Sequence, residues 1–310
     1  MTGRPAKRIV SLGEILWDRF EASRHLGGAP LNFAVHASQL GHAAWIVTRV
    51  GDDPEGREIL GAIAQMGLGC DHVQVHPTKP TGRVNISVNL FGEPKFDILQ
   101  DVAWDYIEAT EAAHALVRSA DVVCFGTLAQ RSPVSRASIH ALLETARSES
   151  RDILVLCDLN LRQQFYTTEI IRQSLNFARV LKLDEDEFCI VKGLMGRGGS
   201  EDRAFARELM DMFGLLMIAV TRSARGCTLH TPDAEVRMPG FVVDVADTVG
   251  CGRAFTAAMV SKLLEGAPFA EVARYANLAG AYVATQPGAT PRLSPFVLER
   301  FQMELERSSQ

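Results

Sequence analysis

Residues 31–51 read LNFAVHASQLGHAAWIVTRVG, and this stretch joins the two patterns that decide the fold class. Apolar side chains in residues 31–41 recur at helical spacing, whereas residues 43–51 form an apolar, β-branched run of strand length. A strand-like run, RIVSLG at 8–13, precedes the stretch, and a second helical window, EGREILGAIAQMG at 55–67, follows it. This alternation predicts an α/β fold with a doubly wound, mostly parallel sheet.

The same alternation continues along the chain. Further strand-like runs occupy residues 121–126, 152–160, 178–184 and 215–221, and helical windows follow Ser132-Pro133 and lie at 202–213, 252–266 and 270–285. No internal repeat or long low-complexity linker separates these elements. We therefore expect residues 1–310 to form a single domain.

One region departs from the alternation. Residues 72–99, HVQVHPTKPTGRVNISVNLFGEPKFDIL, contain period-two stretches and turn residues with no helical window between them. This pattern is typical of a small antiparallel sheet. We expect it to form a lid on the domain, built from about 14–26 and 72–101.

The composition limits the partners. The 310 residues include 37 acidic and 32 basic side chains, a net charge of -5, so no basic stripe is available for nucleic acid or an anionic membrane. The first residues, MTGRPAKRIV, contain no apolar segment of the signal-peptide kind, and LLMIAV at 215–220 is too short to span a bilayer. We expect a cytoplasmic protein that binds small molecules.

Residues 247–255, DTVGCGRAF, carry the most specific chemistry. Gly250 and Gly252 flank Cys251 directly before a helical window, so free backbone N–H groups and the positive end of a helix converge on one point. This arrangement predicts an anion hole for a phosphate. Arg253 follows the glycines, which places a permanent cation beside that hole.

Two N-terminal segments carry candidate sugar-binding residues. Gly27-Gly28 end an extended segment before a helical window that contains Asn32, so a ligand can approach the backbone closely, although a plain turn has the same pattern. Asp18 lies at the far end of GEILWDRF, residues 13–20. A carboxylate accepts two sugar hydroxyls at once, but a solvated loop carboxylate is the alternative interpretation.

Polar residues also follow two strand-like runs in the middle of the chain. DLNLR at 158–162 alternates Asp158, Asn160 and Arg162 at the expected carboxyl end of a strand, where open α/β sheets bind ligands. KLDEDEF at 182–188 contains four consecutive acids, which suit either a hydrated Mg²⁺ or the capping of a helix by Asp184.

Taken in order, these segments resemble the ribokinase or PfkB family of carbohydrate kinases, over about residues 8–295. The resemblance rests on GGAPLNFAVHASQLG at 27–41, VGDDPEGREIL at 50–60 and DTVGCGRAF. FDILQDVAWDYI at 96–107 and DLNLRQQFY at 158–166 are most similar to the fructokinase-like branch, with keto-deoxygluconate kinases as neighbours. The resemblance implies a three-layer α/β/α domain with a β-sheet lid, often in a homodimer, that binds ATP, Mg²⁺ and a sugar.

The resemblance also implies roles for individual residues. The sugar hydroxyls would be held by Asp18, Gly28 and Asn32, with Arg162 near the far end of the sugar. The nucleotide would lie along Lys182, Asp184, Thr221, Gly226 and Asn277. Mg²⁺ would lie near Glu187, a monovalent cation such as K⁺ near Asp247, and the transferring phosphoryl group at Gly250, Cys251 and Gly252.

Three positions depart from the family pattern. Asp184 replaces an Asn, Ser223 replaces a glycine of the nucleotide loop, and Arg253 replaces the catalytic aspartate. Arginine stays protonated and cannot accept a proton from a sugar hydroxyl. Three hypotheses follow: a sugar kinase that is weakened or uses another base such as Asp247 or water, a noncatalytic sugar or nucleotide sensor, or a different chemistry on an anionic substrate paired with Arg253. For the third, Cys251 is the one candidate nucleophile, and a small space-filling residue is the alternative interpretation of it.

Overall fold

Nine strands of the described residues form one large sheet in the order β13-β12-β11-β10-β9-β8-β1-β4-β5. The computed structural model describes residues 6–21, 23–88, 94–149 and 151–308. Pairing is parallel from β11 to β5, and β12 and β13 are added antiparallel at one edge. The strands are β1 (Arg8–Leu12), β4 (Ala43–Gly51), β5 (Val73–His76), β8 (Val122–Phe125), β9 (Leu154–Asp158), β10 (Val180–Asp184), β11 (Met217–Thr221), β12 (Cys227–His230) and β13 (Glu235–Met238).

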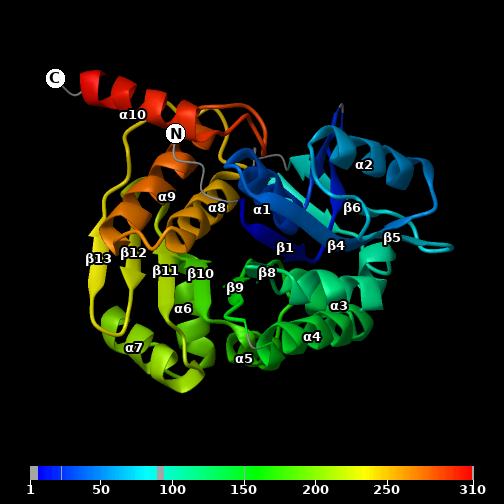
Figure 1. The fold of residues 1–310 in the computed structure, drawn as a ribbon, viewed down its shortest axis with the longest axis horizontal. Helices are drawn as coiled ribbons and strands as arrows, with labels where there is room; N and C mark the ends of the chain where they lie inside the picture. The colour runs from blue at the N-terminus through cyan, green and yellow to red at the C-terminus, as the bar shows by residue number, and fades with distance from the viewer. Residues whose placement is uncertain (1–5, 22, 89–93, 150, 309–310) are drawn as a thin grey trace.

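Helices cover both faces of this sheet (Figure 1). One face carries α1 (Ala29–Gln39), α2 (Pro54–Gln65), α8 (Cys251–Leu264), α9 (Phe269–Ala284) and α10 (Pro295–Ser308). The other carries α3 (Glu111–Arg118), α4 (Pro133–Ser148), α5 (Thr168–Phe177), α6 (Glu185–Leu194) and α7 (Asp202–Phe213). In β1, Ile9 packs in the first apolar layer and Val10 in the second, so apolar side chains are required on both faces of this strand. The expected three-layer α/β/α architecture is therefore confirmed.

A change of chain direction within the sheet places the site. From β1 the chain moves outward through β4 and β5 and then returns to β8 on the other side of β1. The crevice at the carboxyl ends of β1 and β8 is thus a topological switch point, where doubly wound sheets bind ligands. Short 3₁₀ helices follow some strands, namely η1 (Ala103–Tyr106), η2 (Leu128–Arg131) and η3 (Ser223–Arg225).

A second, smaller sheet has the order β3-β2-β6-β7. Its strands are β2 (Leu16–Arg19), β3 (Arg24–Gly27), β6 (Gly82–Val88) and β7 (Pro94–Ile98). Both expected segments contribute to it, but β2 and β6 pair in parallel rather than antiparallel. The predicted lid also included residues 22 and 89–93, which lie outside the described residues.

The predicted lid segment was wrong at its start. Residues 73–76 form β5, which pairs in parallel with β4 at the edge of the main sheet, with Thr48 opposite Val73 and Gly51 opposite His76. An alternating strand has the same sequence pattern in either sheet, so the pattern could not assign residues 73–76 to one of them.

Among the described residues, none of the helices has the length and apolar character that a membrane span requires.

Candidate active site

The glycine loop begins α8 as the sequence predicts. Gly250 is the N-cap residue with φ 87°, and a Cβ at this position would collide with the carbonyl oxygen of Ala289. No side chain caps this helix end. The Cys251 and Arg253 N–H groups donate to the carbonyl oxygens of Thr248 and Gly250 at 3.4 and 2.9 Å, whereas the Gly252 N–H has no partner among the described residues. This N–H group and the positive end of the helix dipole are therefore available for an anionic ligand.

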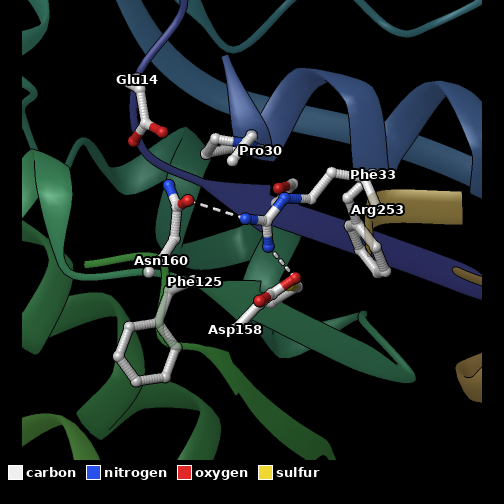
Figure 2. A pocket seen from close by; sticks show the side chains of 11 residues that line it. Glu14, Pro30, Phe33, Phe125, Asp158, Asn160 and Arg253 are labelled. Atoms are coloured by element: carbon white, nitrogen blue, oxygen red, sulfur yellow. Dashed lines mark hydrogen bonds and ion pairs between the residues drawn. The ribbon is translucent and has the colours of Figure 1, made fainter. Parts of the chain in front are cut away.

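Arg253 turns from the first turn of α8 toward the carboxyl end of β9 (Figure 2). Its guanidinium forms an ion pair with Asp158, and Nη2 donates a hydrogen bond of 2.7 Å to Oδ1 of Asn160. Asn160 adopts a left-handed backbone conformation with φ 52°, which asparagine tolerates better than most residues. The Arg253 side chain is 12% exposed, so this cation is held in place rather than solvated.

Asp158 is the buried centre of this charge cluster. Lys182 Nζ lies 3.4 Å from its Oδ1, and the Thr256 hydroxyl donates to its Oδ2 at 2.9 Å. Burial opposes ionisation, but Arg253 and Lys182 together lower the pKa of Asp158, which keeps it anionic. A Cβ on Gly252 would lie 3.4 Å from Lys182 Nζ, so this lysine lies directly against the glycine loop.

Beside Arg253 lies a cavity of about 10 Å³, which is room for about one water. It is lined by Ser11, Glu14, Ala29, Pro30, Phe33, Cys124, Phe125, Gly126, Asp158, Asn160 and Arg253. These residues come from the ends of β1, β8 and β9 and the starts of α1 and α8. The arginine side chain therefore projects into the switch-point crevice.

Glu14 also lines this cavity, although the sequence pattern did not identify it as a site residue. It is 3% exposed, and burial raises its pKa to about 6, although Arg253 and Arg162 act in the opposite direction. Its position two residues after β1 was the available signal, because the carboxyl ends of parallel strands meet at one edge of the sheet.

Several predicted sugar-binding residues lie around Glu14. Gly28 is the N-cap of α1 with φ 116°, and a Cβ there would lie 2.6 Å from the Glu14 carbonyl oxygen. A Cβ on neighbouring Gly27 would collide with Oδ2 of Asp18 in β2. Burial raises the pKa of Asp18 to about 6, against the effects of His25 and Arg162. The small sheet thus brings Asp18 beside the glycine pair.

Asn32 and Arg162 are placed differently. Asn32 is buried in α1 and does not line the cavity beside Arg253, and its Oδ1 has no hydrogen-bond partner among the described residues. Burial and the nearby Arg253 cation lower the pKa of Arg162, while Glu187, Glu14 and Asp184 oppose that change. Arg162 therefore lies within electrostatic range of both the sugar-side carboxylates and Arg253.

The acidic segment after β10 forms a helix cap. Asp184 Oδ1 accepts from the Glu187 N–H at 2.8 Å, and Glu187 Oε2 accepts from the Asp184 N–H at 2.9 Å. Glu187 Oε1 also accepts from the Leu161 N–H at 2.7 Å, and burial raises the pKa of Glu187. Within the described residues, no group of three or more His, Cys, Asp or Glu side chains forms a metal site.

The remaining predicted nucleotide residues gather around the β11–β12 hairpin. Thr221 ends β11 opposite Asp184, and a Cβ on Gly226 would collide with the Met238 carbonyl oxygen. Asn277 Nδ2 donates at 3.3 Å to the carbonyl oxygens of Met238 and Pro239. Ser223 has φ 49°, so it adopts the left-handed conformation that glycine favours.

Asp247 and Cys251 have structural partners. The Asp247 carboxylate accepts from the Val249 N–H at 2.9 Å and from the Gly288 N–H at 3.1 Å. Burial, followed by Asp247, raises the pKa of Cys251 to about 11. This raised pKa works against an activated Cys251 nucleophile, because it makes the thiolate scarce at neutral pH.

Comparison with known proteins agrees with this geometry. A family model described as pfkB family carbohydrate kinase matches residues 7–295. A sugar kinase of Pyrococcus horikoshii is 27% identical over 92% of this chain and 93% of its own length, and fructokinase-2 of Solanum habrochaites is 27% identical over 92% of each chain.

Solved structures agree at the level of the fold. Fructokinase of Xylella fastidiosa with bound ATP has a TM-score of 0.85 at 21% identity, covering 99% of this chain and 100% of its own. Fructokinase of Vibrio cholerae O395 with fructose, ADP and calcium has a TM-score of 0.80 at 22% identity, covering 95% and 98%. Since the family model spans nearly the whole sequence, this chain belongs to the pfkB family of carbohydrate kinases, and its relatives support the fructokinase-like branch.

Proposed function

We propose that this chain catalyses the ATP-dependent phosphorylation of a hydroxyl group of a fructose-like sugar. The observation that carries the proposal is the uncapped glycine loop at the start of α8, which lies against Lys182 at the edge of the sheet that also carries Glu14 and Asn160. The structures of fructokinases with ATP, or with fructose and ADP, support this assignment.

One group of residues would bind the nucleotide and its phosphates. Backbone N–H groups of Gly250, Cys251 and Gly252, with Lys182, would hold the γ-phosphoryl group that ATP supplies. Gly226 and Asn277, with Thr221, would line the nucleotide. Asp184 would lie next to them, because it pairs with Thr221 across β10 and β11.

The sugar would lie on the side of Arg253 that faces away from the nucleotide. Asp18 would accept hydrogen bonds from the sugar hydroxyls, and the Gly28 backbone would lie close to them. Asn32 and Arg162 would make further contacts with the sugar. The small sheet that carries Asp18 would act as the lid that excludes water.

The cations need few protein ligands. Mg²⁺ bound to nucleotide phosphates requires only one or two carboxylates, so the single Glu187 carboxylate near those phosphates would be sufficient without a dedicated cage. Asp247 already organises the loop around Gly288, so a monovalent cation would lie there.

A noncatalytic sugar or nucleotide sensor is the second candidate. The observation that favours it is the ion pair between Arg253 and Asp158, which places a fixed cation where the family has a base. Arg253 also occupies the crevice, leaving a cavity of only about 10 Å³.

The experiment that separates the two candidates is ADP release with Mg·ATP over a panel of ketoses, aldoses and sugar acids. The native protein and Arg253→Asp are compared, with Arg253→Lys as the matched control that keeps the charge. Turnover by the native protein supports the kinase. Sugar and ATP binding without turnover, restored by Arg253→Asp, supports the sensor.

A further inference from the structure

The proposed kinase lacks a proton acceptor at position 253, so another group near Arg253 must fill that role. Asp158 is an unsuitable base because Arg253 and Lys182 hold it as an anion and lower its pKa. Both oxygens of Glu187 accept backbone N–H groups, from Leu161 and Asp184.

The Asp247 carboxylate is also engaged in hydrogen bonds away from this cavity. Its two oxygens accept from the N–H groups of Val249 and Gly288, and it does not line the cavity beside Arg253. Its place is therefore the loop on the outer side of the glycines, where it stabilises backbone conformation.

Glu14 lines the cavity beside Arg253, as Asp158 does, but its pKa is raised where that of Asp158 is lowered. It lines the same cavity as Arg253 and Asn160, and its backbone touches Gly28 on the sugar side. Figure 2 shows Glu14 and Asp158 on opposite sides of the Arg253 guanidinium. A sugar hydroxyl bound between Gly28 and the glycine loop would therefore lie on the Glu14 side of the guanidinium rather than on the Asp158 side.

We propose that Glu14 is the general base of this chain and takes over the role that Arg253 cannot perform. The inference rests on the proposed kinase function. The sugar O–H bond breaks and its proton passes to a Glu14 carboxylate oxygen, while the sugar oxygen bonds to the γ-phosphorus of ATP. The bond between that phosphorus and the β,γ-bridging oxygen breaks, ADP leaves with the electron pair, and Glu14 then releases the proton to water.

Protonation chemistry supports this role. Burial raises the pKa of Glu14 to about 6, so at pH 7 the carboxylate is mostly ionised and still basic enough to accept a proton. When Glu14 becomes neutral, Arg253 keeps its positive charge next to the phosphates, where it stabilises the transferring group as an arginine finger does.

The test is Glu14→Gln, which keeps the size and the carbonyl oxygen but cannot accept the proton. We expect kcat to fall about 10²- to 10⁴-fold with little change in sugar affinity by calorimetry. The native kcat should fall below about pH 6, and the residual activity of Glu14→Gln should lose that dependence. Glu111→Gln, which changes an exposed carboxylate outside the site, should keep it.

A double variant separates catalysis from structure. In Arg253→Asp the carboxylate returns to the family position, so adding Glu14→Gln should reduce kcat far less than the roughly 10²-fold or greater loss expected in the native background. An equal loss in both backgrounds would show that Glu14 only supports the fold, and unchanged kcat in Glu14→Gln would also overturn the proposal. If the native chain is silent and Arg253→Asp is active, Glu14 is not a base although the sugar and ATP sites are competent. If both are silent, the kinase function itself fails.

Discussion

At the scale of single residues, Arg253 is defined by its partners. Next to a glycine loop it resembles a free cation, but in the fold it forms an ion pair with Asp158 and donates to Asn160. Asp158 is only 4% exposed, and Arg253 and Lys182 stabilise its buried negative charge. The arginine therefore contributes to stability as well as to any chemistry.

The first prediction concerns this buried ion pair. Replacing Arg253 by Met leaves Asp158 with only Lys182 and Thr256, and breaking a buried pair typically costs about 3–5 kcal/mol of unfolding free energy. Urea unfolding monitored by circular dichroism measures the change. Arg300→Met, which removes an exposed i,i+4 pair with Glu304, is the control and should cost about 0–1 kcal/mol. Equal losses in the two variants would refute the buried-pair argument.

At the scale of an element, the start of α8 depends on the close approach of a distant loop. Gly250 supplies the left-handed conformation, and Ala289 presents its carbonyl oxygen where a side chain would begin. The Ala289 carbonyl oxygen also lies 3.1 Å from His36 Nε2 in α1. One peptide group thus fixes both the glycine loop and the neighbouring helix.

The second prediction compares two glycines with similar backbones. Gly250→Ala combines a left-handed alanine, about 1–2 kcal/mol, with a collision worth about 1–3 kcal/mol more, and it should abolish ATP-dependent turnover. Gly266 has φ 70° and open space where a Cβ would lie, so Gly266→Ala should cost only about 1–2 kcal/mol and keep activity. Thermal unfolding and the ADP assay decide between them. Similar melting temperatures for the two variants would contradict the role of Ala289.

At the scale of the whole molecule, Glu55 in α2 anchors the small sheet to the main domain. Its buried carboxylate pairs with Arg19 of β2, with Arg24 of β3 at 3.5 Å and with Arg83 of β6 at 2.5 Å. These strands also carry Asp18 and lead into the glycine pair. Glu58 in the same helix also pairs with Arg24, at 2.6 Å, so Glu55 is the main but not the sole anchor of the proposed lid.

The third prediction tests this anchor. Glu55→Gln leaves Arg19 and Arg83 facing a neutral group, while Arg24 keeps its pair with Glu58. Hydrogen exchange should therefore rise in β2 and β6 while β8 and β9 stay protected. The KM for sugar should rise more than kcat falls. Glu111→Gln, which removes an exposed pair with Arg118, is the control and should change neither quantity. Uniform exchange across both sheets would mean that Glu55 supports overall stability rather than the lid.

Much of the fold followed from local pattern. The predicted run at 43–51 coincides with β4, and the window at 202–213 coincides with α7, because apolar periodicity reflects which side chains face the core. The glycine loop before a helix and the polar residues after β9 and β10 were also visible, since strand ends and helix starts are local features.

The sequence by itself thus determined the layers, the family and the edge of the sheet where chemistry is expected. Tertiary structure alone decided that β5 joins the main sheet, that Cys251 has a raised pKa, and that Glu14 shares a cavity with Arg253. The hydrogen bond from Arg253 to Asn160 joins residues 93 positions apart, and the one from Thr256 to Asp158 spans 98. Such contacts depend on strand order and on the angle at which α8 meets the sheet, and neither is encoded in a local pattern.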